Sequence, residues 1–294
     1  MKTRRSAASV LAKAAIYLVL LLLAVACAFP VLHVLALSLS SSTAAASGRV
    51  VLLPVEFTAK SYLFVLDNSA FIRSFGISLQ RVMLGFPINM LLTLLLAYPL
   101  SRTKAQFRAR NALSWFFLVT ILFGGGLIPL YMVIRSTGLI DSIWALIIPS
   151  AVPVYNVILL MNFFKSLPDE LEEAAFMDGA GHVTILSRIY VPLSAPALAT
   201  ISLFVIVGHW NAWFDGLLFM NSPAKYPLQS YLQTIVINRD PKMLTERDLE
   251  LLKLINERTT KAAQIFIAMI PIICAYPFLQ KYFTTGIVVG AVKG

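Results

Sequence analysis

Residues 167–192 read LPDELEEAAFMDGAGHVTILSRIYVP, a charged stretch in an otherwise apolar chain. Pro168 and the acids after it suit the first turn of a helix, where a missing N–H loses no hydrogen bond and carboxylates complement the helix dipole. Gly179 can adopt a positive φ and end this helix, and a second helix is predicted beyond it, as far as Tyr190. We therefore predict two short helices joined by a glycine turn over residues 167–190.

The composition places the chain in a membrane. Of its 294 residues, 59% are apolar and 13% are charged, whereas soluble domains carry about 25% charged residues. An apolar segment of about 20 helical residues crosses about 30 Å of hydrocarbon. Segments of this kind lie near residues 14–38, 72–100, 112–134, 143–164, 196–220 and 262–284. We predict an all-α, polytopic membrane protein with six transmembrane helices, and a single transmembrane domain over residues 1–294.

The basic residues set the predicted orientation. Residues 1–13 and the loop 101–111 each carry four basic residues and no acid, and loops of this kind remain on the cytoplasmic side. With six spans, residues 165–195 and both termini fall on that side too. The first apolar run continues past Cys27 to about Leu39, which favours a retained first helix over a signal peptide. The net charge of +10 then reflects topology and anionic lipid, and nucleic acid is not an expected partner.

Two larger segments, residues 39–71 and 221–261, are predicted to lie outside. The second contains a charged stretch from Glu246 to Lys261 that reads as a helix, with apolar residues recurring at intervals of three. This stretch suits either a docking surface for an external protein or a solvated lid over the spans. The sequence leaves both interpretations open.

The acidic helix within residues 167–192 is too short to be stable alone. Isolated helices need about 12–15 residues, so a helix of about ten residues has to dock on something. Four acids lie between Glu170 and Asp178, and they disfavour the negative cytoplasmic leaflet as the docking surface. A small Ala174-Ala175 step would let the backbone of another protein come close. These features favour a partner protein over an interfacial helix on lipid.

A family resemblance rests on the spacing Glu173-Ala174-Ala175, three residues, Gly179, nine residues, Ile189-Tyr190-Val191-Pro192. This spacing resembles the cytoplasmic signature of binding-protein-dependent ABC transporter permeases. Val191 stands where the family has Leu, which is a mild apolar exchange. The extension Asp178-Gly179-Ala180 also resembles the family, and residues 280–286 and 290–294 are similar to the tail of its carbohydrate-type members. The resemblance covers essentially the whole chain.

The resemblance implies a type I importer permease (MetI-like) fold in which residues 167–190 are the coupling helices, held in a cleft of an ATP-hydrolysing subunit. It implies that ATP closes two such subunits, that paired permeases rock from inward-facing to outward-facing, and that a periplasmic or surface-anchored binding protein delivers the solute. Carried over by position, Glu173 contacts the ATPase, Ala174 packs closely and Gly179 makes the turn. The residues implied in coupling are Glu170, Glu173, Ala174, Ala175, Asp178 and Gly179.

The sequence predicts no catalytic residue, metal site or cofactor for this chain. Its single candidate phosphate loop, Gly286 to Lys293, lacks the Gly-Lys-Ser/Thr ending and a following helix. ATP and Mg are therefore expected on two partner ATP-binding cassette subunits. A second homologous permease in a heterodimer, a solute-binding protein, an oligosaccharide and membrane lipid complete the expected partners. The expected location is the bacterial inner (plasma) membrane.

Polar residues inside the apolar segments are candidates for a translocation pathway, because placing them in a membrane is costly. Trp210, Asn211 and Trp213 combine ring faces with an amide, which suits sugars, although helix packing with an interfacial aromatic belt explains them equally well. His209 is predicted to be a packing residue rather than a proton relay. The pathway candidates are Arg81, Tyr155, Asn156, Trp210, Asn211, Trp213 and Asp215.

The second apolar segment contains an arginine, and the third contains three consecutive glycines and a proline; each feature is unfavourable in a straight transmembrane helix. Arg81 either snorkels outward, the interpretation that we favour, or lies within the membrane and needs an acid, a carbonyl or an acidic solute as its partner. Gly124-Gly125-Gly126 with Pro129 predicts a bend in the third span, of a kind that gating could use.

The segment Trp210–Gly216, with residues 226–229, resembles permeases for polysaccharide-derived oligosaccharides such as alginate or pectin fragments. An oligosaccharide is therefore the expected cargo, with an acidic one as the narrower hypothesis. The alternative is a secondary transporter driven by an ion gradient, which requires intramembrane carboxylates, and only Asp215 is a candidate. A membrane-bound enzyme would need His, Asp or Glu residues clustered at one membrane face, whereas the three histidines of this chain are scattered. The two cysteines lie in apolar runs without metal or disulfide spacing and are predicted to be small core residues.

Overall fold

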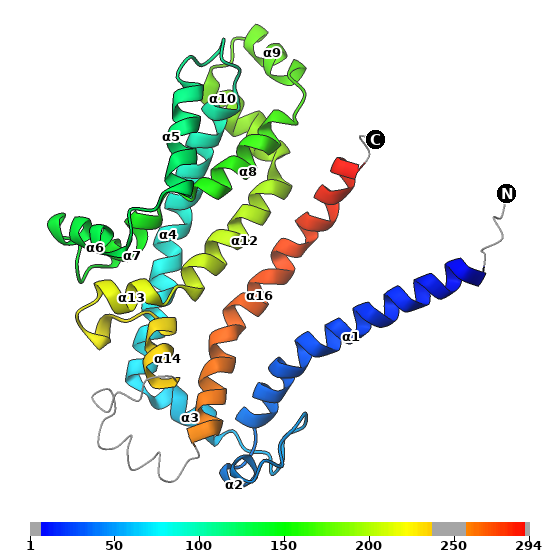
Figure 1. Ribbon diagram of the computed structural model, residues 1–294, viewed down its shortest axis with the longest axis vertical. Helices are drawn as coiled ribbons and strands as arrows, with labels where there is room; N and C mark the ends of the chain where they lie inside the picture. Colours follow the sequence, from blue (N-terminus) through cyan, green and yellow to red (C-terminus); the bar gives the residue numbers. More distant parts are fainter. Residues whose placement is uncertain (1–6, 237–256, 292–294) are drawn as a thin grey trace. The chain divides into compact units, whose positions relative to one another are not determined.

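The computed structural model describes residues 7–236 and 257–291, and all regular elements within these ranges are helices, as predicted (Figure 1). Three of them contain stretches long and apolar enough to cross a membrane. They are α1 (Ala7–Ser38), α4 (Ser69–Ser101) and α16 (Glu257–Ala291). Of the charged helix predicted over residues 246–261, the part up to residue 256 lies outside the described residues.

Three further candidate spans are pairs of helices that meet at a bend, so the described residues hold between three and six candidate spans. The bends measure 115°, 44° and 84° in chain order. The first pair is α5 (Arg110–Leu122) with α6 (Leu127–Ser136). The second is α7 (Ile143–Ile147) and a 3-10 turn η1 (Ile148–Ser150) with α8 (Val154–Lys165). The third joins the segment His182–Leu193 to α12 (Ala195–Asn211).

The third predicted span, residues 112–134, contains the expected bend and is broken there. Gly126 has a φ of +87° and stands directly before α6, so the chain turns at a position that favours glycine. With 13 residues, α5 is about 20 Å long at 1.5 Å per residue, which is shorter than the hydrocarbon layer. The segment is therefore two short helices at a 115° bend, and the bend predicted within residues 112–134 is confirmed.

The fifth predicted span, residues 196–220, is also shorter than expected. The helix α12 ends at Asn211, and α13 (Phe214–Phe219) begins after a break of two residues. Ala212 is extended, with φ −68° and ψ 122°. The end predicted at residue 220 is wrong, and the cause lies in the polar contacts described below.

The chain divides into two compact units, Met1–Phe71 with Asn238–Ile270, and Ile72–Ile237 with Pro271–Gly294. In the first unit, α2 (Ser42–Ala46) and α3 (Lys60–Asp67) follow α1. Hydrogen bonds from Ser41 and Arg49 hold the pKa of the Glu56 carboxyl below its usual value. Most large apolar side chains of α1 are exposed, which suits a helix surrounded by lipid.

Both cysteines are free thiols on exposed positions, Cys27 on α1 and Cys274 on α16. Their prediction as core residues is wrong. The physical reason is that an apolar run in a membrane-spanning helix does not have to be buried inside the protein, because lipid is as apolar as a core.

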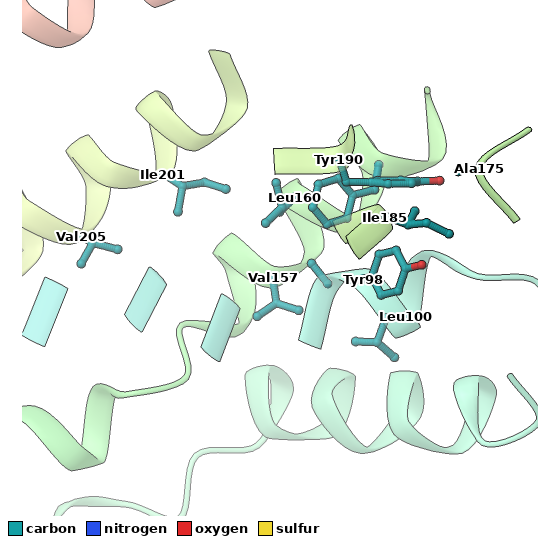
Figure 2. Packing of buried hydrophobic residues seen from close by; sticks show 11 residues of the cluster. Tyr98, Leu100, Val157, Leu160, Ala175, Ile185, Tyr190, Ile201 and Val205 are labelled. Carbon is teal, nitrogen blue, oxygen red and sulfur yellow. The ribbon is translucent and has the colours of Figure 1, made fainter. Parts of the chain in front are cut away.

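The core of the second unit fastens the two short helices of residues 167–192 to the long helices. Figure 2 shows its buried side chains, which come from α4, α8, α9 (Glu170–Met177), α10 (His182–Ile185), the π-helical turn η2 (Leu186–Tyr190) and α12. Within this unit, α9 and α10 lie towards one end, and α13 and α14 (Leu228–Val236) lie towards the other (Figure 1). Two clusters of polar side chains are described below, one that includes a residue of α9 and one that includes a residue of α13.

Candidate functional site

The acidic helix and the glycine turn form as predicted. Helix α9 begins at Glu170 and carries its acids in the first turn. At its other end, Gly179 has a φ of +79°. The N–H of Gly179 donates to Phe176 O at 3.0 Å and the N–H of Ala180 to Ala175 O at 2.9 Å, which is the pair of bonds of a Schellman motif. This motif needs a left-handed residue at position 179, which explains the glycine.

A buried ion pair fixes the inner side of α9. Glu172 and Arg102, the residue that follows α4, are both buried and form a salt bridge. The Arg102 guanidinium lies 4.7 Å from the ring centre of Tyr98 on α4 and 4.8 Å from that of Tyr190 on η2. The Tyr190 hydroxyl donates to Glu172 Oε2 at 2.7 Å. We name these four side chains the anchor cluster, and they tie α9 to the end of α4.

The outer side of α9 faces away from the unit. Glu173 and Ala174 are exposed, and Met177 is 88% exposed. Ala175, by contrast, is buried in the core of its own unit (Figure 2). A close approach by a partner therefore concerns Ala174, and the expectation that both alanines face a partner is wrong for Ala175. The other coupling candidates, Glu170 and Asp178, are exposed.

A second polar cluster surrounds Arg81, which is 2% exposed on α4. Its Nη1 donates to Asp215 Oδ1 at 3.0 Å and to Ala212 O at 3.5 Å. Its Nη2 donates to Asp215 Oδ2 and, at 3.1 Å, to Leu146 O. Its Nε donates to His209 Nδ1 at 3.5 Å. Snorkelling of Arg81 is therefore wrong, and the alternative, an acid and carbonyls as partners, is confirmed.

These contacts also explain why α12 ends at Asn211. The extended backbone after it turns the carbonyl of Ala212 and the carboxylate of Asp215 towards the guanidinium. Carbonyls at the end of a helix lack partners within the helix, and a buried cation needs acceptors for its charge. The break satisfies both requirements.

The hydrogen bonds continue from Arg81 through His209 to Asn89 and Ser150. Asn89 Nδ2 donates to Ser150 O at 2.7 Å, so its Oδ1 accepts the proton of His209 Nε2 at 2.9 Å. His209 Nδ1 is then free to accept from Arg81, which requires a neutral imidazole. His209 is buried and hydrogen-bonded, as predicted for a satisfied packing residue.

A cavity of about 300 Å³ lies beside this cluster within the second unit. It brings together three of the pathway candidates, Arg81, Asn156 and Asp215. The other four candidates do not line it. Tyr155, Asn211 and Trp213 are exposed elsewhere, and the buried Trp210 packs edge-to-face on Phe75 with ring centres 5.5 Å apart. Among the described residues, no group of three or more His, Cys, Asp or Glu could hold a metal ion.

The comparison with known families identifies the chain. The profile of the family described as "Binding-protein-dependent transport system inner membrane component" matches residues 81–289. The chain belongs to this family. It is a permease component of a multi-pass inner-membrane ABC importer, and the sequence-based family resemblance is confirmed.

Two relatives of the permease come from Bacillus subtilis (strain 168). The polygalacturonan/rhamnogalacturonan transport system permease protein YtcP is 38% identical over 95% of this chain and 97% of its own length. The protein LplC is 40% identical over 90% of this chain and 89% of its own length. A solved structure of a bacterial ABC transporter involved in the import of the acidic polysaccharide alginate contains a chain that is 31% identical. That chain has a TM-score of 0.88, with 96% of this permease and 100% of that chain covered.

Sequence reasoning missed several residues of both clusters in the permease. Glu172 precedes the family motif, and Arg102 counted as a topology charge, so neither suggested a buried pair. Asn89 is a polar residue within the second apolar segment, and this signal could have singled it out. Gly85 gave no signal by itself, although a methyl group at this position would stand 2.5 Å from His209 Nε2.

Replacing Gly85 with alanine is expected to destabilise the permease by about 1–3 kcal/mol, because the added methyl group overpacks the contact with His209. Gly76, on the same helix, has nothing within 4 Å of an added Cβ. Gly76→Ala should therefore be neutral or stabilising by up to about 1 kcal/mol. Thermal unfolding of the two purified variants in detergent checks this difference. Equal melting temperatures for both would show that the close approach of α4 and His209 is absent.

Proposed function

We propose that this permease forms, with a second homologous permease, the translocation pathway of an importer for an oligosaccharide. The known cargo of its relatives supports this proposal: YtcP is a polygalacturonan/rhamnogalacturonan transport system permease, and the structurally similar transporter is involved in the import of the acidic polysaccharide alginate. Maltodextrin and arabinooligosaccharide permeases are further relatives, each 24% identical. An acidic oligosaccharide is the narrower form of the proposal.

One observation carries the proposed mechanism, namely that the two sides of α9 differ. Its inner side is fixed to α4 through the buried pair of Glu172 and Arg102. Its outer side exposes Glu173, Ala174 and an apolar Met177. A short helix fixed on one side and exposed on the other suits a joint that receives force from a partner. We propose that ATP-binding cassette subunits dock here, bind ATP and Mg, and drive transport by hydrolysis.

The charges around this joint support a cytoplasmic location for it. The basic loop 101–111 begins at the anchor cluster, since Arg102 belongs to both. Positively charged loops remain on the cytoplasmic side, and an ATPase finds its nucleotide there. We propose that α9, α10 and both chain termini are cytoplasmic, and that a binding protein delivers the solute from the opposite face.

The complete transporter in proteoliposomes tests this function. The binding protein and a labelled oligosaccharide are supplied outside, and ATP with Mg is enclosed inside. Uptake is expected only with hydrolysable ATP, and it should persist when ionophores abolish all ion gradients. Uptake that needs an ion gradient and no ATP would instead show a secondary transporter. The pairing of Asp215 with Arg81 speaks against that alternative, because it neutralises the carboxylate that ion coupling would need.

A further inference from the structure

The cavity beside Arg81 has the size and the walls of a small binding site. Its volume of about 300 Å³ lies at the lower end of the range of about 300–1,000 Å³ found for ligand pockets. Polar groups from α4, α8, α12 and the segment after α12 converge on it, and Phe204 adds an aromatic wall. Such a mixture of an apolar wall and a few convergent polar groups is typical of sites for small organic molecules.

Asn156 supplies the observation that points to a ligand. The residue lines the cavity and is 6% exposed. Its main-chain N–H donates to Pro153 O at 2.9 Å. Its side-chain amide bonds to no other residue within the described part of the chain, and it is open to the cavity rather than sealed in the protein. An amide carries two N–H donors and an acceptor oxygen, and an amide that meets the cavity without a protein partner can offer them to a molecule in it. A ligand that both donates and accepts hydrogen bonds would provide the missing partner.

Arg81 cannot supply a cation to such a ligand. A guanidinium has five N–H donors, and in Arg81 each of them already meets a protein acceptor. The acceptors are Asp215 Oδ1 and Oδ2, Ala212 O, Leu146 O and His209 Nδ1. A solute carboxylate would have to displace Asp215 from a bidentate pair. The arginine therefore holds the walls of the cavity together and does not bind an acidic solute there.

Asp215, the hydrogen-bond acceptor of the ion pair, can still accept a hydrogen bond from a ligand. The side chain of Asp215 is 26% exposed, against 3% for Arg81. Its Oδ1 accepts from Arg81 and from the N–H of Gly216 at 2.9 Å, whereas its Oδ2 accepts from Arg81 alone. Because a carboxylate oxygen has about two acceptor positions, Oδ2 can take one more donor. That donor can be a hydroxyl group, and a second carboxylate would be repelled.

From these contacts we infer that the cavity is a subsite for the hydroxyl groups of a sugar ring, and that it disfavours carboxylates. One hydroxyl donates to Asp215 Oδ2, a second exchanges hydrogen bonds with the Asn156 amide, and Phe204 covers an apolar face of the ring. This inference rests on the proposed oligosaccharide import. It adds that any acidic group of the cargo is recognised outside this cavity.

Asn156→Leu in the complete transporter tests the subsite, because leucine has a similar volume and no hydrogen-bonding group. Uptake of a neutral and of an acidic oligosaccharide of equal length should each fall at least tenfold. The melting temperature should not fall, since the amide pairs with nothing in the protein. Asn162→Leu is the matched control, as Asn162 is on the same helix and exposed, and its uptake should be unchanged.

A second variant, Asn156→Asp, tests the preference against carboxylates. It should reduce the uptake of the acidic oligosaccharide at least threefold more than that of the neutral one. Unchanged uptake in Asn156→Leu, or a loss of uptake that follows a lowered melting temperature, would overturn the subsite while leaving the proposed function intact. Equal effects of Asn156→Asp on both sugars would overturn the carboxylate discrimination. A wild-type transporter that imports no oligosaccharide with ATP would overturn the proposed function and the subsite together.

Discussion

Gly179→Val is expected to reduce ATP-driven uptake at least tenfold while the permease still inserts into the membrane. Position 179 has a φ of +79°, and the left-handed region costs an ordinary residue about 1–2 kcal/mol, with β-branched residues among the least tolerant. Valine would therefore open the Schellman bonds to Phe176 and Ala175 and change the angle between α9 and α10. Uptake of labelled oligosaccharide, corrected for the amount of inserted protein, measures the effect.

Gly181→Val is the matched control for this change. Gly181 has an ordinary extended φ of −81°, and an added Cβ meets nothing within 4 Å at either glycine. The control should therefore retain most of the uptake. If both variants transported normally, the turn at Gly179 would have no part in coupling. If both failed equally, bulk at this surface rather than the turn would be the cause.

Asp215→Leu should destabilise the permease by about 3–5 kcal/mol, because it leaves the buried guanidinium of Arg81 without its counter-charge. The double variant Arg81→Met/Asp215→Leu removes both charges and should regain most of the lost stability. Thermal unfolding of the purified single and double variants measures this coupling.

The exposed pair of Lys225 and Asp141, with Nζ and Oδ2 2.5 Å apart, provides the comparison for the buried pair. Lys225→Met should leave the melting temperature nearly unchanged, because exposed ion pairs contribute little. Additive effects of the two substitutions at Arg81 and Asp215 would show that these residues do not form a pair in the folded permease.

The helices around Gly179 could be predicted because their signals are local. Pro168, the acids after it and the glycine specify a start and an end within about a dozen residues, and the structure places α9 between them. The bend in the third span was predictable for the same reason, since Gly126 itself adopts the positive φ. Its size of 115° was not, because glycine permits a turn without setting its angle.

The polar cluster at Arg81 could not be predicted from local signals. Arg81 is 128 residues from His209 and 134 residues from Asp215 in the chain, and its partners include main-chain carbonyls that have no sequence signature. Because the sequence does not reveal these partners, snorkelling was the simplest expectation for an arginine near the end of a span. The same contacts ended α12 early at Asn211, so one missed cluster accounts for two wrong predictions.

The anchor cluster shows a similar limit. Glu172 and Glu173 are neighbours in one acidic helix, yet the first is buried against Arg102 and the second is exposed. Which of two adjacent acids faces inward depends on the position of α4 relative to α9, which is a tertiary feature. The family motif identifies the helix, and the fold assigns its two sides.

In the proposed mechanism, α9 and its glycine turn deliver the energy of ATP hydrolysis to transport. The most direct measurement is the number of ATP molecules hydrolysed per oligosaccharide imported, in proteoliposomes that contain the complete transporter. A constant ratio is predicted for the wild type and for Gly181→Val, and a ratio at least tenfold higher for Gly179→Val, in which hydrolysis continues without import. A wild-type ratio in Gly179→Val would show that the glycine turn has no part in coupling hydrolysis to transport.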